Sequence, residues 1–400
     1  MKNLLCARLW LAVSLSCIGE PALAVLPPQA GVGPAAALPP AGVAAVPQPA
    51  EEGLRFETIA PGVHLIWTPP IPGFERRKAK VVVAEFDTFT ALIEAPWDDR
   101  SVRQILRTIE LRIPGKPVRF ALHSHHHDHS IQAVDPLLAA GATIVTSPWN
   151  LEELVKLTAD EGTLRRRAIV VKDRFEIGDR TNRLIVHVLR RGPAPDGWDV
   201  PTPEYMVFEV PERDLLVSGC LYNKPKETHE VISGRKRALS RFISEKGVSA
   251  GTLVPTNTTS ELGFEDVCTL QMLHDSLIEG LDPAEVSRQW GAVTAEEMRA
   301  RLGEIVQEHE ARKTRAFDFL VCQSKLVVDG RPGHALVWLD AASRLHPSDP
   351  YLWYESGNRA WELGQFDDAE RRWARAVDAA RDAIERGELR EGIDEKRAGK

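Results

Sequence analysis

Short hydrophobic runs separated by amphipathic stretches fill the chain between residues 51 and 260. β-Branched and aromatic residues dominate these runs, which predicts strands at residues 63–67, 79–85, 89–94, 118–122, 143–146, 184–189, 205–210 and 215–218. Apolar residues at helical spacing predict helices between them, at residues 99–110, 133–140 and 150–156. Alternation of the two patterns is typical of a mixed α/β domain in which helices cover sheets.

After about residue 260 the strand pattern gives way to helical periodicity, and the sequence repeats itself every 34 residues. The matched pairs are Gly330 with Gly364, Ala335 with Ala369, Leu339 with Trp373, and Ala342 with Ala376. Small residues at helix crossings, with large apolar residues between them, resemble the tetratricopeptide repeat, here as two units. Because two units bury little surface alone, we expect a helix at residues 295–312 to pack on them. A groove that binds a protein partner and a purely structural extension are both open.

The first 24 residues have the pattern of an export signal. Lys2 and Arg8 precede an apolar run at residues 9–18, and the small residues around Ala24 follow it. This run is too short to cross a bilayer, so we expect a soluble exported protein, periplasmic or secreted, without a membrane span. A lipid anchor, the alternative, would use Cys17.

The predicted organisation has six parts: a signal peptide at 1–24, a Pro/Ala-rich linker at 25–50, an α/β domain at 51–260, a helical extension at 261–313, two tetratricopeptide-like repeats at 314–383 and a charged, frayed tail at 384–400. Loss of the signal peptide leaves Cys220, Cys268 and Cys322, an odd number, so at least one thiol stays unpaired. Cys268 and Cys322 lie in helical patterns and are expected to be buried. Cys220 ends a predicted strand, where site residues often lie.

Charge argues against one class of partner. The chain has 50 Lys and Arg against 57 Asp and Glu, a net charge of -7. Without a global basic field, nucleic acid is not an expected partner. Three basic clusters, at residues 76–78, 165–167 and 235–237, would suit an anionic ligand, but we expect them to lie in solvated loops.

A histidine cluster carries the strongest chemical signal. Five of the 12 histidines fall between His123 and His129, directly after a predicted strand. In an extended loop alternate side chains share one face, so His125, His127 and His129 are placed to converge. Neutral imidazoles together with a carboxylate such as Asp128 are the ligands that zinc prefers. The alternative is a solvated polar turn.

The run His-x-His-x-Asp-His is the signature of the metallo-β-lactamase fold hydrolases, and "HSHHHDHS" resembles it. The segments "ALIEAPWDD", "AAGATIVTS" and "PERDLLVSGCLYN" are also similar to that family, and the likeness covers about residues 53–260. The resemblance implies an α/β fold, a four-layer αβ/βα sandwich, here followed by the all-α repeat region. It also implies that Asp128 binds metal and orients the nucleophilic water, and that Cys220 occupies the place of a metal ligand.

Two registers fit the motif. Counted from the strand, His125 and His127 take the two family histidine positions; counted back from Asp128, Ser124 and His126 do. Several other family positions differ. Glu94 replaces the commoner Asp, Pro195 replaces a histidine, and Asn257 replaces the last histidine. The substrate-holding Lys expected three residues after the Cys is Asn223, so β-lactam hydrolysis is not predicted. Replacement ligands would be Asp196, Asp199, His229, His64 or His187.

The sequence therefore predicts an exported metal-dependent hydrolase with an unknown small-molecule substrate. One zinc ion, if present, would be held by some subset of His125, His127, Asp128, His129 and Cys220. Bound zinc would lower the pKa of water to about 7 and polarise an ester, amide or similar bond. The first alternative is a non-catalytic sandwich that acts on a protein partner through its repeats; the second is metal storage or sensing. Pocket residues would come from loops 68–80 and 192–203, with Trp67, Phe74 and Trp198 as candidates.

Overall fold

The computed structural model describes residues 54–68, 79–127, 130–191, 200–226, 230–248, 250–260, 263–381 and 383–399. The predicted signal peptide and linker lie outside these residues. Within the described part of the chain, no helix is long and apolar enough to cross a membrane.

The first sheet has seven strands, which follow one another in chain order. They are β1 (Phe56–Ala60), β2 (Val63–Trp67), β3 (Lys80–Glu85), β4 (Thr90–Ile93), β5 (Val118–Leu122), β6 (Thr143–Thr146) and β7 (Ala168–Val170). Strands β1 to β4 pair antiparallel, and β4 to β7 pair parallel. The carboxyl ends of β4 and β5 therefore lie at one edge of the sheet, together with the amino end of β3.

The second sheet has six strands in the order β13 (Cys268–Thr269), β12 (Thr252–Pro255), β11 (Leu215–Gly219), β10 (Glu204–Val210), β9 (Arg183–Arg190) and β8 (Arg174–Gly178). A short 3-10 turn, Pro211–Arg213, joins β10 to β11. Within this sheet, β11 and β12 pair parallel, and the other neighbouring strands pair antiparallel. The carboxyl ends of β11 and β12 thus share one edge of this sheet.

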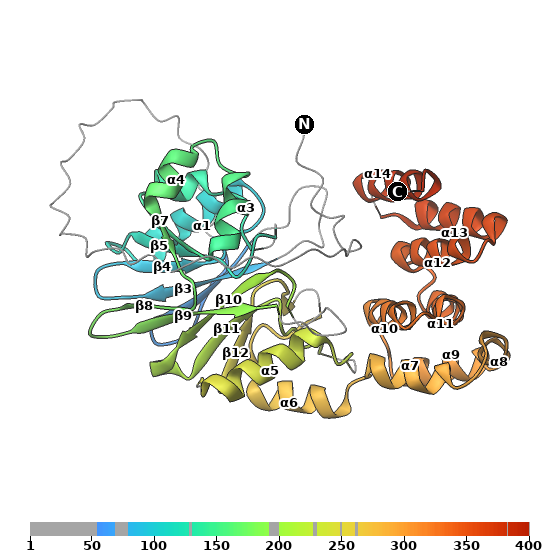
Figure 1. Cartoon of the computed structure of the whole chain (residues 1–400). Helices are drawn as coiled ribbons and strands as arrows, with labels where there is room; N and C mark the ends of the chain where they lie inside the picture. The colour runs from blue at the N-terminus through green and yellow to red at the C-terminus, as the bar shows by residue number, and fades with distance from the viewer. Residues whose placement is uncertain are drawn as a thin grey trace, which may run out of the picture. The chain divides into compact units, whose positions relative to one another are not determined.

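Alternate side chains of the buried strands pack in opposite directions. In β3, Val82 and Ala84 belong to a hydrophobic core shared by both sheets, whereas Val81 and Val83 belong to a core shared with the covering helices. These helices are α1 (Asp99–Arg112), α2 (Asp135–Ala139), α3 (Pro148–Val155) and α4 (Glu161–Arg167). On the second sheet, α5 (Gly234–Lys246) and α6 (Leu270–Glu279) contribute to a third core. The four layers, helices, sheet, sheet and helices, are visible in Figure 1 and confirm the predicted fold class.

The rest of the described chain is helical: α7 (Pro283–Gly291), α8 (Ala295–Ala300), α9 (Leu302–Ala311), α10 (Ala316–Val328), α11 (Pro332–Leu345), α12 (Pro350–Glu362), α13 (Phe366–Ala379) and α14 (Ala383–Arg397). Helix α12 begins 34 residues after α10, and α13 begins 34 residues after α11, as the sequence repeat predicts. The repeated positions are buried: Ala335, Leu339, Ala342, Ala369, Trp373 and Ala376.

Some local predictions were wrong. The helix expected at residues 295–312 is divided into α8 and α9 at Arg301. Most of the expected frayed tail is helix α14, whose residues Leu389 and Ile393 are buried. Cys268 lies in strand β13 rather than in a helix, although it is buried as expected. Strands β1, β7 and β8 went unpredicted because their exposed or polar positions weaken the hydrophobic pattern.

Candidate functional site

The candidate site lies where the ends of four strands from the two sheets come together. Glu94 follows β4 and the histidine cluster follows β5 in the first sheet; Cys220 follows β11 and Thr256 follows β12 in the second. Hydrogen bonds join the two sheets at this point. The N–H of Met206, in the second sheet, donates to the carbonyl of Ser124, which follows β5 of the first sheet, at 2.7 Å. Polar side chains from distant parts of the chain are thereby brought into one buried cluster.

Glu94 organises the histidine loop. Its side chain is fully buried and its φ is 73°, an uncommon conformation for a residue with a Cβ. One carboxylate oxygen accepts the Ser124 N–H at 3.2 Å and the Ser130 hydroxyl; the other accepts the Thr256 hydroxyl at 3.3 Å. Glu94 therefore connects the two sheets through hydrogen bonds.

His125 is the central imidazole of the cluster. It is fully buried, and its Nδ1 lies 2.8 Å from the Ser124 hydroxyl. Its other nitrogen, Nε2, lies 3.0 Å from Nδ1 of His127 and 3.7 Å from Sγ of Cys220. His127 and Cys220, two residues of types that bind zinc, therefore each lie close to Nε2 of His125.

The neighbouring histidines have different surroundings. The ring of His126 packs edge-on against Trp149, with centroids 4.7 Å apart, and edge-on against His127. His123 is fully buried with Nε2 3.2 Å from the Thr146 hydroxyl. Burial, and then the nearby His126, lower the pKa of His123 to about 3, so this imidazole is neutral at physiological pH.

Cys220 is held by Tyr205, a residue that the sequence analysis did not single out. The Cys220 N–H donates to the Tyr205 hydroxyl at 2.7 Å, and this hydroxyl lies 3.2 Å from the Ser218 carbonyl and 3.6 Å from Sγ of Cys220. Burial, followed by the charges of Cys220 and Glu94, raises the pKa of Tyr205 well above 10. The phenol thus stays neutral and fixes the Cys220 backbone.

A basic cluster also reaches the site, contrary to expectation. Residues 235–237 lie in the first turns of α5 and not in a solvated loop. The half-buried Arg235 has a guanidinium nitrogen 3.7 Å from Sγ of Cys220, and the buried Lys236 is ion-paired with Glu230. Residues 165–167 likewise lie in the last turn of α4. A contact between Arg235 and Cys220 could not be inferred from a local run of three basic residues.

Other predicted site residues have separate outcomes. Asp128 and His129 lie outside the described residues, as do Phe74, Pro195, Asp196, Trp198, Asp199, His229 and the basic cluster at 76–78. Nε2 of His64 lies 3.1 Å from Glu85, and Nε2 of His187 lies 2.8 Å from Glu209, so these two histidines pair with carboxylates on neighbouring strands. The indole N–H of Trp67 donates to Asp266 at 3.3 Å, which makes Trp67 part of a polar cluster.

The donor atoms can be compared with the geometry of a zinc site. Nitrogen and sulfur ligands arranged as a tetrahedron at about 2.0 to 2.3 Å from zinc lie roughly 3.3 to 3.8 Å from one another. The two contacts of His125, at 3.0 and 3.7 Å, fit this range within a few tenths of an ångström. Among the described residues, however, no three His, Cys, Asp or Glu side chains form a group able to hold a metal ion. The chemical type of these donors and their pairwise distances from His125 suit zinc, and a complete site would need a further ligand.

Solved structures similar to this chain are metallo-β-lactamases. The FIM-1 enzyme of Pseudomonas aeruginosa in its mono-zinc form shares 16% identity over 57% of this chain and 96% of its own, with a TM-score of 0.40. The Hirschia baltica enzyme shares 14% identity over 57% of this chain and 97% of its own, with a TM-score of 0.41. The Pontibacter korlensis enzyme shares 16% identity over 56% of this chain and 97% of its own, with a TM-score of 0.43. No protein-family model matches the chain. Such low identities say nothing about activity, and the fold class rests on the strand order and layers of this chain.

Proposed function

We propose that this protein is an exported metal-dependent hydrolase, with its active site at the edge where β4, β5, β11 and β12 end. The observation that supports it best is the position of His125, whose Nε2 lies close to both His127 and Cys220. These three residues belong to two loops that are far apart in the sequence. Imidazole and thiolate donors together favour zinc over harder cations such as magnesium.

The surrounding residues orient the donors. The Ser124 hydroxyl at Nδ1 of His125 directs Nε2 toward the other two donors, as hydrogen-bond partners of metal-binding histidines do. Tyr205 and Glu94 fix the backbone on each side, and their burial excludes bulk water from this part of the site. Bound zinc would supply Lewis acidity and lower the pKa of water. We assign the orientation of the attacking water to Asp128, and a ligand role to His129 as well.

The proposal is tested by hydrolysis assays on the purified full chain. The substrates are chromogenic esters, amides, phosphodiesters and a β-lactam, assayed with added zinc and with a chelator. We expect turnover of at least one class that the chelator abolishes, and a loss of at least about 100-fold in the Cys220→Ser and His125→Ala variants. His64→Ala is the matched control, because His64 pairs with Glu85 on a strand. Turnover that survives both the chelator and the Cys220→Ser substitution contradicts a metal-dependent site.

A further inference from the structure

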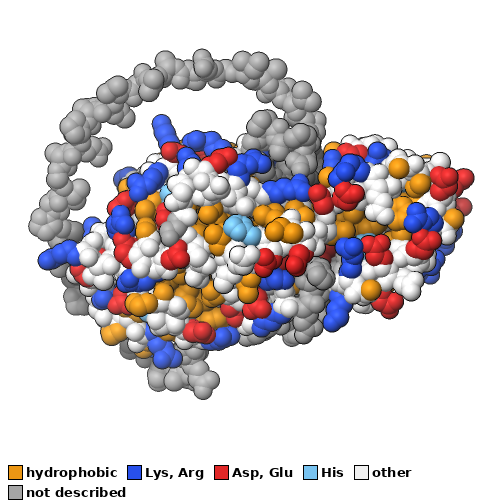
Figure 2. Space-filling view, turned by 90° about the horizontal axis from the view of Figure 1, so that it is seen from below, with side chains coloured by type: hydrophobic (Ala, Val, Ile, Leu, Met, Phe, Trp, Pro, Cys, Tyr) orange, Lys and Arg blue, Asp and Glu red, His pale blue; other side chains and the backbone are white. Residues whose placement is uncertain are grey.

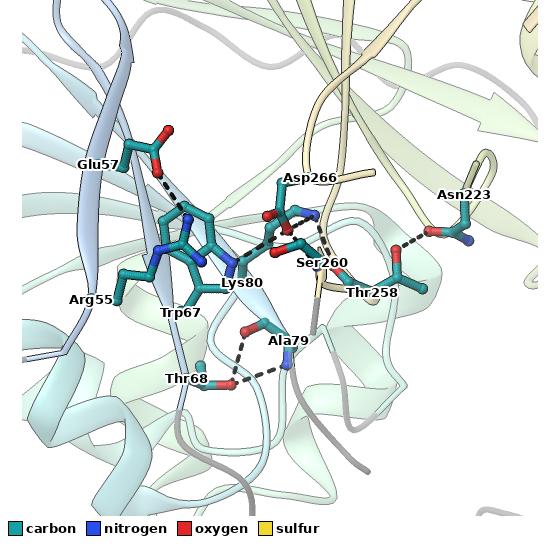
Figure 3. Close-up of polar contacts among 10 residues, drawn as sticks. All are labelled: Arg55, Glu57, Trp67, Thr68, Ala79, Lys80, Asn223, Thr258, Ser260 and Asp266. Atoms are coloured by element: carbon teal, nitrogen blue, oxygen red, sulfur yellow. Dashed lines mark hydrogen bonds and ion pairs between the residues drawn. The ribbon is translucent and has the colours of Figure 1, made fainter. Parts of the chain in front are cut away.

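A buried lysine lies at the same edge of the first sheet as the candidate site. Lys80 is the first residue of β3, and its side chain is fully buried. Its ammonium group donates to the Thr258 carbonyl at 2.7 Å and lies 3.2 Å from Oδ1 of Asp266 (Figure 3). The same carboxylate oxygen accepts the Trp67 indole N–H at 3.3 Å and the Ser260 N–H at 3.0 Å. A buried charge with these partners is held in one position.

Lys80 fixes a short segment of the second sheet at two points. Its backbone N–H donates to the Thr256 carbonyl at 2.9 Å, and its side chain holds the Thr258 carbonyl two residues later. Both contacts cross between the sheets. The Thr258 hydroxyl makes a further hydrogen bond to Asn223 at 3.0 Å, as Figure 3 shows. The segment that follows β12 is therefore attached to the first sheet at two points by one residue of β3.

Thr256 connects this segment to both donor loops. Its backbone N–H donates to the Gly219 carbonyl at 3.2 Å, directly before Cys220. Its hydroxyl donates to Glu94, which in turn accepts the Ser124 N–H. The Ser124 hydroxyl contacts the imidazole of His125. From the segment 256–258, which the Lys80 side chain holds at Thr258, hydrogen bonds thus run to His125 on one side and to the residue before Cys220 on the other.

We propose that Lys80 is a positioning residue whose side chain, by holding the segment 256–258, sets the separation between His125 and Cys220. Lys80 does not contact either donor, so its role would be to hold the two loops in register across the sheets. The effect on metal affinity rests on the proposed function, whereas the effect on the position of Cys220 does not.

The positional effect can be measured without metal. Cys220, Cys268 and Cys322 are all buried, so each reacts with iodoacetamide only when its surroundings open. In metal-free full chain, peptide mapping by mass spectrometry gives each alkylation rate separately. We expect Lys80→Met and Thr256→Val to raise the rate at Cys220 several-fold with no change at Cys322, which lies in α10. Thr256→Ser, which keeps the hydroxyl, and Lys80→Arg should restore the slow rate in whole or in part.

Two results overturn the proposal. If Cys220 and Cys322 become reactive together, the substitutions loosen the whole molecule and Lys80 is only a stabilising residue. If neither rate changes in Thr256→Val, the series of hydrogen bonds does not position Cys220, and this holds even if Lys80→Met fails to fold.

Cobalt binding gives the second readout, because cobalt replaces zinc and shows its thiolate ligands in the absorption spectrum. We expect Thr256→Val to weaken cobalt affinity by about 10- to 100-fold relative to Thr256→Ser, the range for loss of a hydrogen-bonding group that holds metal ligands in place. Equal cobalt affinities in the two Thr256 variants overturn the positioning role toward metal. If wild-type protein binds no cobalt, the proposed function fails, and the alkylation rates still decide the role of Lys80.

Discussion

At the scale of single residues, buried polar groups of the site are paired with partners from distant segments. Glu94 and Lys80 are fully buried and hydrogen-bonded across the sheets, and the fully buried His125 contacts Sγ of Cys220 in another loop. An unpaired group in such a place costs about 1 to 3 kcal/mol, more if charged. The site is therefore sensitive to the loss of single hydrogen-bonding groups.

Lys80 also predicts a pH dependence of stability. Burial lowers its pKa from 10.5 to about 8, although the charge of Asp266 opposes the shift. Between these values the unfolded chain holds a proton that the folded chain has released, so stability rises with pH from about 8 to about 10.5. Across this pH window the free energy of unfolding rises by about 3 kcal/mol.

The measurement compares urea unfolding of wild type and Lys80→Met at several pH values across this window. We expect the stability of wild type to increase relative to the variant as pH rises, because only wild type carries the desolvated ammonium below pH 8. Parallel pH profiles for the two proteins would contradict the assignment of a lowered pKa to Lys80.

At the scale of elements, the carboxyl ends of parallel strand pairs place the polar residues. Gly219, at the end of β11, has a φ of 59°, and a Cβ there would lie 2.0 Å from the Tyr205 hydroxyl. The close approach of strand and phenol is what allows Tyr205 to reach the backbone of Cys220. Position 219 therefore favours glycine for two reasons: its positive φ and the nearby Tyr205 hydroxyl.

Substitution of Gly219 tests this arrangement. Gly219→Ala should lower the free energy of unfolding by about 2 to 4 kcal/mol, because it adds steric overlap to the strain of a positive φ. The matched control is Gly247→Ala at the end of α5, where φ is 61° and no atom lies within 4 Å of the added Cβ. There only the strain of about 1 kcal/mol applies. Equal losses in urea unfolding would show that Tyr205 does not restrict this position.

The sequence predicts the elements better than it predicts the site. Hydrophobic runs located most buried strands. The spacing of histidines after β5 predicted that His125, His127 and His129 converge; the first two lie 3.0 Å apart, and His129 lies outside the described residues. Tyr205 is the first residue of the predicted strand 205–210 and Lys80 the second residue of the predicted strand 79–85, and nothing in the pattern around either residue indicates a role in the site. Their partners are far away: Lys80 reaches Thr258 across 178 positions of sequence. Such contacts follow from how the sheets pack and leave no local pattern.

At the scale of the whole molecule, the candidate site lies at strand ends of the two sheets, whereas the helical repeats pack around cores of their own. Charged side chains of both signs are interspersed on the face shown in Figure 2, without a broad region of one sign. The last helices have small hydrophobic cores of their own, which include Trp373, Leu389 and Ile393. Repeat units depend mainly on contacts with their neighbours. Substitutions at the site should therefore leave the helical circular dichroism signal of the repeats unchanged.

His125 and Cys220 are the proposed donors to a metal ion, and the metal content of tag-free full chain, measured by native mass spectrometry, tests this directly. We expect about one zinc ion per chain in wild type and in Cys322→Ser, whose substituted thiol lies in α10. His125→Ala, Cys220→Ser and the double variant Asp128→Ala, His129→Ala should lose it while remaining folded. No bound zinc in wild type after incubation with the metal, or zinc retained in both His125→Ala and Cys220→Ser, would contradict the account.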